Sequence, residues 1–347
     1  MEQDLIKIIN ISIYAPSGDN SQPWNFKIKN NSIFVYNISE RDRSLYNFNN
    51  NAALIAIGGL LTNIRIAASH FNYTVEIKII NNNNLVAECN FKKDNINEDE
   101  LFLYIKTRQT NRKPYKQKTP DKNIFKQLLI ANIYEHLKIE IVTESNLITR
   151  IADACSVNEQ IVLENKKLHD FLFNHITWTN KEDMIKKGFY IKTLELNGPQ
   201  AVVFKLLKSW RINSFFNKIG ISKFIAKENA KLYSESGAMI AITSNIIDNK
   251  IFIETGMLMQ RLWLIATKHE LYMQPLTGIT FLKNTINSSD GIKEFNSEHL
   301  KLIESSYKKI KNIFNNNDEH INFIFRVGYA EKPTAGTRRL NAEIATG

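Results

Sequence analysis

The stretch Ala15-Pro16-Ser17-Gly18-Asp19-Asn20-Ser21-Gln22-Pro23-Trp24 forms a polar connection between an expected amphipathic helix and an expected strand. Its Gly, Asp and Asn residues favour a tight turn with backbone groups directed outward. The side chains of Ser17, Asn20 and Gln22 both donate and accept hydrogen bonds. A planar heterocycle with alternating carbonyls and ring nitrogens needs such a mixture along its edge. The ordered set A-P-S-x-x-N-x-Q-P-W therefore indicates a ligand-binding loop.

Hydrophobic periodicity predicts helices and strands around this loop. Residues 2–14 place apolar side chains on one helical face, and residues 50–71 read as a longer apolar helix. A β-hairpin is expected around Asn30-Asn31, and a second strand pair around residues 81–84. Later in the chain we expect helices near 97–107, 121–131, 145–170 and 250–270, and strands at 139–142, 238–243 and 321–327.

Length and composition fit one large domain or two ordinary ones. The chain has 347 residues, of which 43% are hydrophobic and 23% charged, as is usual for a soluble protein with a real core. Its net charge is +10, and a basic surface attracts polyanions. However, the chain has no helix-turn-helix, RNP-type or Cys/His finger signature, so we expect no nucleic-acid partner.

Targeting and cysteine patterns favour a reducing, cytoplasmic location. The N-terminus is acidic and has no signal-peptide core, and no uninterrupted apolar run approaches the length of a membrane span. We therefore expect no membrane association. Cys89 and Cys155 are the only cysteines and form no CxxC pair, so neither a disulfide framework nor a metal site is expected.

A second informative stretch runs from Thr107 to Tyr115 and reads T-R-Q-T-N-R-K-P-Y. Arg108 and Arg112 lie four residues apart, with Thr110 between them. Guanidinium groups bind phosphate oxygens bidentately, and a hydroxyl group supplies a further donor. Such a run is usually a solvated basic surface when it occurs alone. In combination with the first loop it indicates a phosphate site.

These stretches together resemble the FMN-binding elements of the nitroreductase superfamily. The A-P-S-x-x-N loop is similar to the flavin-contacting loop of that family, and R-x-T-x-R is similar to its R-x-S-x-R/K phosphate element. The P-x-x-G segment at 275–278 resembles the loop that presents backbone N–H groups to the flavin N5. A basic residue of the C-terminal tail corresponds to the one that closes over the phosphate. The resemblance covers nearly the whole chain and is weakest in residues 171–236.

The resemblance implies a definite set of cofactor-binding residues. Ser17 and Asn20 would lie at the ring, whereas the Arg108 to Arg112 segment would hold the ribityl chain and phosphate. The full set comprises Pro16, Ser17, Gly18, Asn20, Gln22, Arg108, Gln109, Thr110, Arg112, Pro275, Leu276, Thr277, Gly278, Arg338 and Arg339, with Arg338 and Arg339 as alternatives at the phosphate. If this is right, Asn20 and Arg108 must line one cavity.

The order of the motifs indicates two fused repeats. In an ordinary nitroreductase subunit the Arg element precedes the P-S-x-x-N loop, and each flavin site of the homodimer takes one element from each subunit. Here the loop comes first, at 15–24, and the Arg element follows at 108–112. This order resembles the Acg-type branch of the superfamily, whose members are tandem single chains. A repeated A-x-x-H-x-x-Y pattern at 67–73 and 266–272 agrees with duplication.

An α+β fold of two nitroreductase-like repeats follows from the resemblance. Each repeat would have a central, mostly antiparallel sheet flanked by helices, with the first repeat at 1–95 and the second at 96–347. The second would contain a helical insertion at 171–236, which is either a lid over a site or a packing extension. A fused pair has little need to pair further, so we expect a monomer or a weak homodimer.

The activity implied by the resemblance is that of an FMN-dependent oxidoreductase. It would move a hydride from NAD(P)H to an electron-poor acceptor such as a nitroaromatic or a quinone. No Ser-His-Asp, Cys-His or metal-ligand constellation emerges, and none is required because a flavin carries the chemistry itself. Two alternatives stay open: a flavin-binding or storage protein with little turnover, and a flavin-dependent dehydrogenase in a biosynthetic pathway.

Overall fold

Two large β-sheets organise the chain in the computed structural model, which describes residues 1–314 and 319–346. A third sheet has only two short strands, β6 (Ile176–Thr177) and β7 (Phe189–Tyr190). The first sheet has the strand order β11-β1-β2-β4-β3. Its strands are antiparallel except for β11, which pairs in parallel with β1. The strands are β1 (Trp24–Lys29), β2 (Ser32–Asn37), β3 (Tyr73–Asn82), β4 (Leu85–Lys93) and β11 (Ile344–Thr346).

The second sheet is fully antiparallel and has the order β5-β8-β10-β9. Its two central strands are buried along nearly their whole length, because helices cover the sheet. The strands are β5 (Leu137–Val142), β8 (Ala238–Ser244), β9 (Tyr272–Pro275) and β10 (His320–Gly328). Together the sheets and helices form the α+β architecture predicted from the sequence.

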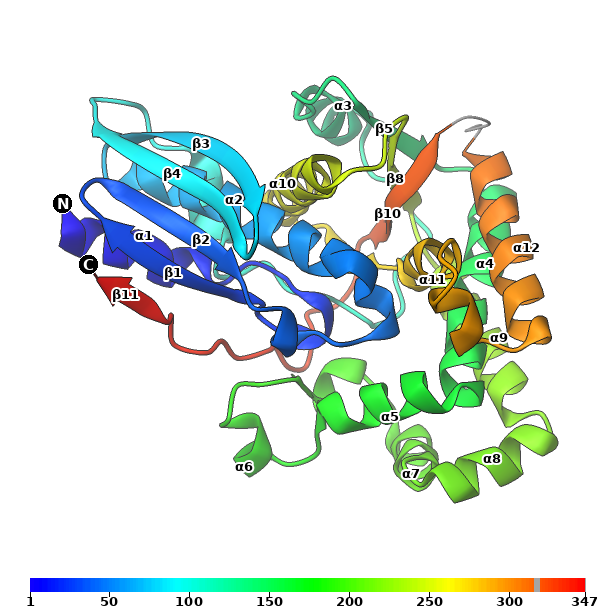
Figure 1. The fold of residues 1–347 in the computed structure, drawn as a ribbon. Helices are drawn as coiled ribbons and strands as arrows, with labels where there is room; N and C mark the ends of the chain where they lie inside the picture. The colour runs from blue at the N-terminus through cyan, green and yellow to red at the C-terminus, as the bar shows by residue number, and fades with distance from the viewer. Residues whose placement is uncertain (315–318, 347) are drawn as a thin grey trace.

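The two longest apolar helices, α2 (Asn51–His70) and α10 (Asn249–Lys268), pack against each other between the sheets (Figure 1). One continuous hydrophobic core includes both helices and parts of both sheets. The outer helices are α1 (Glu2–Ser12), α3 (Lys122–Ile130), α4 (Ser145–Glu164), α11 (Gly278–Ile286) and α12 (Ser297–Ile313).

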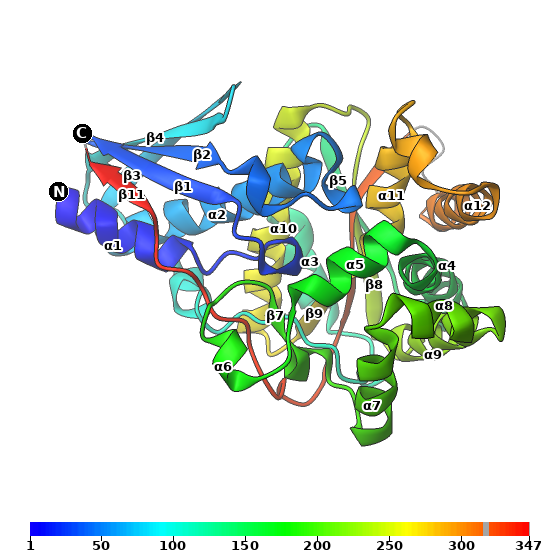
Figure 2. The same ribbon diagram turned by 60° about the horizontal axis from the view of Figure 1, so that its bottom comes forward.

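Residues 166–234 form a helical unit that extends from one side of the molecule (Figure 2). The unit has a small core of its own, which includes Phe173, Phe189 and Leu207. Its elements are α5 (Lys166–His175), β6 (Ile176–Thr177), α6 (Asn180–Asp183), β7 (Phe189–Tyr190), α7 (Gly198–Leu207), α8 (Trp210–Lys218) and α9 (Ile221–Ser234). This unit corresponds to the predicted insertion at 171–236.

The C-terminal tail connects the two sheets. After β10 ends in the second sheet, the chain runs back past the loop at 15–24 and adds β11 to the edge of the first sheet. The Phe26 amide donates a hydrogen bond to the Glu343 carbonyl, 3.0 Å away, at the start of this pairing. Both chain ends therefore lie at the same side of the molecule (Figure 1).

Two predicted helices differ from the observed ones. Instead of a helix at 97–107 there is a short 3-10 helix, Glu100–Tyr104, after which the chain extends to bring Thr110 beside Met273 of β9. The predicted helix at 145–170 is two helices that break at Asn165. The Asn165 side chain accepts a hydrogen bond from the Leu168 amide and so caps α5.

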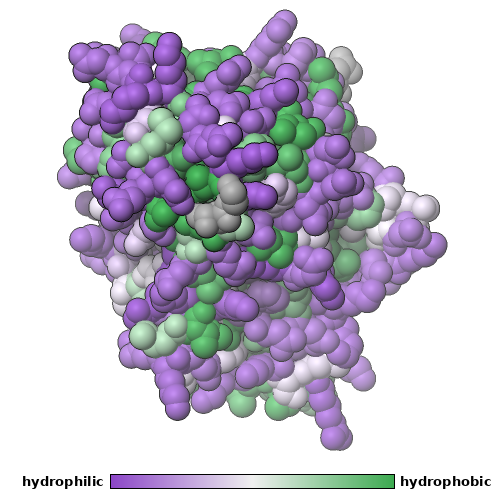
Figure 3. Space-filling model, turned by 60° about the vertical axis from the view of Figure 1, so that its left-hand side comes forward, coloured by the Kyte–Doolittle hydropathy of each residue, from purple (hydrophilic) through white to green (hydrophobic). Residues whose placement is uncertain are grey.

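Residues 45–70 meet the length and hydropathy criteria for a membrane span, although no apolar run of that length was predicted. Within this segment, 94% of the apolar window is buried inside the protein. The segment ends in α2, so its apolar character is explained by its place in the core. The face of the molecule seen in Figure 3 is mostly hydrophilic, with hydrophobic side chains in small groups.

Candidate functional site

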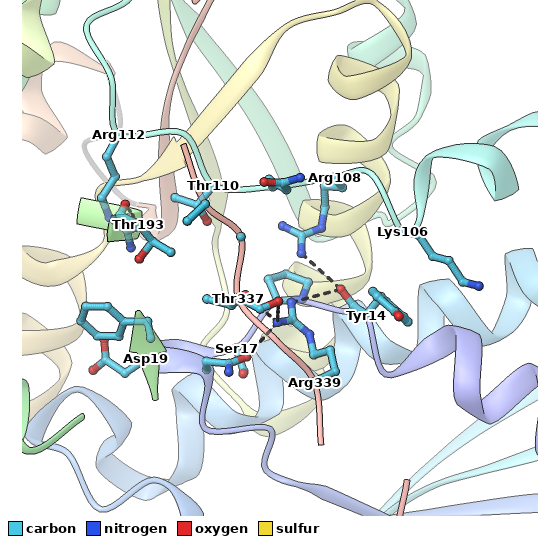
Figure 4. Close-up of a pocket in the computed structure, with 16 residues that line it drawn as sticks. Tyr14, Ser17, Asp19, Lys106, Arg108, Thr110, Arg112, Thr193, Thr337 and Arg339 are labelled. Atoms are coloured by element: carbon cyan, nitrogen blue, oxygen red, sulfur yellow. Dashed lines mark hydrogen bonds between the residues drawn. The ribbon is translucent and has the colours of Figure 1, made fainter. Parts of the chain in front are cut away.

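Four segments that are distant in sequence enclose one polar cavity of about 150 Å³ (Figure 4). The expected loop contributes Asn20 and the basic stretch contributes Arg108, so these two residues line the same cavity. The insertion and the C-terminal tail close it. The lining residues are Tyr14, Pro16, Ser17, Asp19, Asn20, Lys106, Arg108, Gln109, Thr110, Arg112, Phe189, Thr193, Ala335, Gly336, Thr337 and Arg339.

The loop at 15–24 is held in an uncommon backbone conformation. Asp19, Asn20 and Gln22 have φ values of 44°, 57° and 50°, in the left-handed region that non-glycine residues rarely adopt. The Ser17 hydroxyl accepts a hydrogen bond from the Gln22 amide at 3.0 Å, which closes the loop on itself. Such strain persists only where surrounding contacts enforce it, and it is concentrated at functional sites.

The side-chain amides of this loop are engaged with the protein. Asn20 Nδ2 donates to the carbonyls of Gly188 and Arg338, at 2.8 and 3.0 Å. Gln22 Nε2 donates to the Lys186 carbonyl, and its Oε1 accepts from the Leu340 amide. These amides therefore tie the loop to the insertion and the tail. Asn20 also lines the cavity, and the contact of these side chains with a heterocycle stays a prediction.

Three arginines of the cavity carry positive charge without a carboxylate partner among the described residues. Arg108 lies with its guanidinium 4.4 Å from the centre of the Trp263 ring and donates to the Tyr14 carbonyl at 3.2 Å. Its Nε atom is buried and has no hydrogen-bond partner. Arg339 donates to Asn20 Oδ1 at 2.8 Å, and Arg112 donates to the Thr193 carbonyl at 3.1 Å.

Burial disfavours the charged form of all three arginines, and repulsion from Arg339 adds to this effect at Arg108. Burial lowers the pKa of Arg108 to about 9, and the nearby charge of Arg339 adds to the effect. Burial likewise lowers the pKa of Arg339 to about 10 and that of Arg112 below its ordinary value. Buried groups with shifted pKa values in a cleft mark candidate functional sites. The three guanidinium groups are suited to bind an anion, although the carboxyl group of Asp19 also lines the cavity.

The two tail arginines have different roles. Arg339 lines the cavity, whereas Arg338 points to the insertion and forms an ion pair with Asp183 at 2.8 Å. Of the two candidates for the phosphate contact, the geometry favours Arg339. Gln22 is buried, with 1% of its surface exposed, and does not line the cavity.

A second, larger cavity of about 380 Å³ adjoins the first. The two cavities share Asp19, Arg112 and Phe189 as lining residues. Gly18 and the predicted loop of Pro275, Leu276, Thr277 and Gly278 line this second cavity. The loop leads into α11, and the first amides of a helix have no partners within the helix. Backbone donors are thus available at this wall.

The insertion contributes a largely apolar part of the lining of the second cavity. This part includes Phe171, Leu172, Leu194, Phe204 and Ile225. Together with the amide-bearing loop at 275–278, this part of the lining encloses a space suited to a flat aromatic group. The sequence had not identified these residues, because a Leu or Phe in a helix reads as ordinary core.

A carboxylic acid group of the second cavity was also missed. Glu159 Oε1 accepts a hydrogen bond from the Tyr233 hydroxyl at 2.8 Å, whereas its Oε2 is buried without a partner. Burial raises the pKa of Glu159 to about 7. At the junction of the cavities, burial and then the charge of Asp42 raise the pKa of Asp19 to about 6. Both carboxyl groups therefore stay protonated up to a higher pH than carboxyl groups ordinarily do.

We expect Glu159→Gln to stabilise the protein without ligand at high pH. The folded state binds the Glu159 proton more tightly than the unfolded state, whose pKa is 4.5, so wild-type stability falls as pH rises from about 4.5 to 7. Denaturant unfolding of the ligand-free protein should show little difference at pH 4. Above pH 7 the variant should be more stable by about 3 kcal/mol. The exposed Glu228→Gln serves as a control, and a constant offset across pH would contradict the assignment.

Comparisons with known proteins find only distant similarities. No protein-family model matches the chain. A curated relative, the uncharacterized protein MT1398 of Mycobacterium tuberculosis (strain CDC 1551 / Oshkosh), is 20% identical over 336 residues. The match includes 96% of this chain but only 46% of the relative, so the chain spans less than half of that protein's length.

Solved structures similar to the chain include three nitroreductase-type proteins. A nitroreductase-like family protein from Bacillus cereus has a TM-score of 0.35 and 13% identity over 71% of this chain and 93% of its own. A nitroreductase with bound FMN from Bacteroides fragilis has a TM-score of 0.36 and 8% identity, over 70% of this chain and 94% of its own. The FMN-dependent nitroreductase NfnB from Mycobacterium smegmatis, in complex with NADPH, has a TM-score of 0.37 and 10% identity. The match covers 65% of this chain and 86% of that protein. At such values the cofactor of this chain has to be inferred from its own site.

Proposed function

We propose that this chain is a tandem member of the nitroreductase superfamily, with repeats at 1–95 and 96–347, that binds one FMN in the two adjoining cavities. The observation that carries the proposal is the unpaired arginine group around the first cavity. Arg108, Arg112 and Arg339 come from segments far apart in sequence, yet they surround one cavity that also contains Asn20. A phosphate dianion would satisfy the buried Nε of Arg108, which has no partner in the protein, and would balance the charge of all three arginines.

The two cavities match the two chemical parts of FMN. The polar cavity would take the phosphate and ribityl chain, with the Thr110 hydroxyl as a further donor. Ser17, which the sequence predicts at the ring, lines this cavity and would contact the same part of FMN. The larger cavity would take the ring between the 275–278 loop and the apolar wall of the insertion. When bound, FMN would supply two-electron hydride transfer between a reduced nicotinamide and an acceptor. The backbone amides at 277 and 278 would then donate to the ring edge.

Residues of this chain also provide the proton that such a reduction requires. Glu159 lines the larger cavity and, with its raised pKa, is partly protonated at neutral pH. The Tyr233 hydroxyl holds one carboxyl oxygen and leaves the other without a partner. We therefore assign Glu159 as the proton source for an electron-poor acceptor such as a quinone or a nitroaromatic. The enzyme would be cytoplasmic, reduced by NAD(P)H, and a monomer or a weak homodimer.

One observation favours a second candidate, a flavin-storing protein. The insertion supplies a large share of the second cavity's wall, including Leu194, Leu196 and Phe204. If these side chains occupy the place of the nicotinamide, the flavin is held without being reduced. A storage protein would thus bind the same cofactor as the enzyme. The two functions differ only in whether a nicotinamide can reach the flavin.

We expect the purified protein to be yellow and to release about one FMN per chain on heating. A colourless protein that ignores added FMN would contradict both functions. Anaerobic mixing with NADH and with NADPH separates the enzyme from the store. Bleaching of the flavin absorbance within the mixing experiment supports the enzyme, whereas unchanged absorbance after long incubation supports storage.

A further inference from the structure

The outer side of the insertion exposes an unusual concentration of large hydrophobic side chains. Seven of the seventeen large hydrophobic residues exposed in the described part of the chain lie between residues 202 and 224. Phe215, Ile219 and Phe224 have 65%, 72% and 59% of their surface exposed. The other four are Val202, Val203, Leu206 and Ile212. We call residues 202–231 the cap surface.

The cap surface is also strongly basic. It contains seven Lys and Arg residues and a single acidic residue, Glu228, so its net charge is +6. The net charge of the whole chain is +10. All seven basic residues are exposed. Among the described residues, only Lys223 of this group forms an ion pair, with Glu298 at 3.8 Å. The basic residues are Lys205, Lys208, Arg211, Lys218, Lys223, Lys227 and Lys231.

Apolar and basic side chains share the same helix faces. On α8, Phe215, Lys218 and Ile219 lie three or four residues apart and so project from one side. On α9, Phe224 and Lys227 are related in the same way. The helices α7 and α8 extend from the molecule beyond the second sheet (Figures 1 and 2). The cap surface is therefore free to meet a broad, flat partner.

We propose that the cap surface docks on an anionic lipid bilayer. Helices with aromatic and aliphatic side chains beside lysines lie in the membrane interface, where the apolar groups enter the acyl boundary and the cations face lipid phosphates. The composition favours lipid over an acidic protein, because Lys is depleted at protein interfaces whereas six of these seven cations are Lys. This proposal departs from the expectation of no membrane association, which rested on the absence of a signal-peptide core and of a predicted membrane span.

The docked surface is the outside of the wall that lines the larger cavity. On α7, Phe204 lines the cavity while its neighbours Val203 and Lys205 are exposed. On α9, Ile225 lines the cavity beside the exposed Phe224. The helices α7 and α9 therefore carry both cavity-lining and exposed side chains, so the cap surface and the larger cavity share these two helices. If the proposed function holds, this placement favours an acceptor that partitions into lipid.

Vesicle flotation tests the docking without reference to the flavin. The full chain should float with vesicles of equal parts phosphatidylcholine and phosphatidylglycerol, and not with phosphatidylcholine alone. Phe215→Ser with Phe224→Ser should remove binding. Lys218→Glu, Lys227→Glu and Lys231→Glu together should weaken it about tenfold or more, since each lysine contributes separately. Higher salt should weaken wild-type binding.

A matched control is available at the end of α3. Ile130 and Ile133 are 79% and 72% exposed and lie far from the cap surface in sequence, so Ile130→Ser with Ile133→Ser should leave flotation unchanged. Failure of the wild type to float, or equal loss in the control, would overturn the proposal. Binding to soluble heparin without flotation would also overturn it and indicate an acidic macromolecule. FMN content is measured on each sample, so a colourless protein that floats rejects the cofactor and retains the docking.

Discussion

Replacing Arg108 and Arg112 together by alanine should abolish FMN retention through purification. Each charge-assisted hydrogen bond to the phosphate is worth about 1.5–3 kcal/mol, so losing two costs roughly 3–6 kcal/mol. This corresponds to an affinity loss on the order of 10²- to 10⁴-fold. The dissociation constant is measured by fluorescence titration of the ligand-free protein with FMN. Arg43→Ala with Arg150→Ala, two exposed arginines outside the cavity, should bind as the wild type does.

Loss of FMN binding must be separated from loss of folding, and the site itself provides the means. The lowered pKa of Arg108 shows that burial and the charge of Arg339 disfavour its charged form. Arg108→Met removes that charge and keeps an apolar stem against Trp263. We therefore expect this variant to bind FMN poorly and yet be as stable as the ligand-free wild type, or more stable by about 1–4 kcal/mol. A variant that binds FMN normally would reject the phosphate assignment.

Much of the polar cavity could be predicted from the sequence, because its residues belong to short ordered motifs. Ser17, Asn20, Arg108 and Thr110 all line the same cavity, as expected from the loop and the basic stretch. The motifs could not predict what each side chain does. Whether an Asn amide faces a ligand or holds a neighbouring segment depends on contacts such as that between Asn20 and Gly188, 168 positions apart.

Residues outside the motifs were missed for a different reason. Glu159 lies on a long amphipathic helix, where a carboxylate at that spacing reads as a solvated residue. Only the approach of Tyr233 from α9 encloses it. The cap surface was missed in the same way, since its lysines seemed part of a charge scattered over the chain. Both features depend on how the insertion folds, and the resemblance to the nitroreductase superfamily is weakest there.

The fold depends on a close crossing of α2 and α10, which was not predicted from the sequence. Gly58 of α2 lies against the backbone of α10, and Gly256 of α10 lies against the backbone of α2. A Cβ atom at Gly58 would lie 2.0 Å from the Ile253 carbonyl oxygen, and one at Gly256 would lie 1.9 Å from the Ile55 oxygen. Because both neighbours are helix backbone, neither can move aside alone. We expect Gly58→Ala to lower the free energy of unfolding by about 3 kcal/mol or more, as overpacking does in a dense core.

The neighbouring residue provides a matched control, because Gly59→Ala adds the same methyl group to the same helix. A Cβ at Gly59 would meet the flexible end of Met259 at 3.4 Å, an ordinary contact. Alanine favours a helix over glycine by about 1 kcal/mol, so Gly59→Ala should be neutral or slightly stabilising. Denaturant unfolding of both variants measures the contrast. Equal stabilities would show that the helices do not cross at Gly58. A separation of the helices would also move Trp263, which packs against Arg108, so the destabilised variant should lose FMN as well.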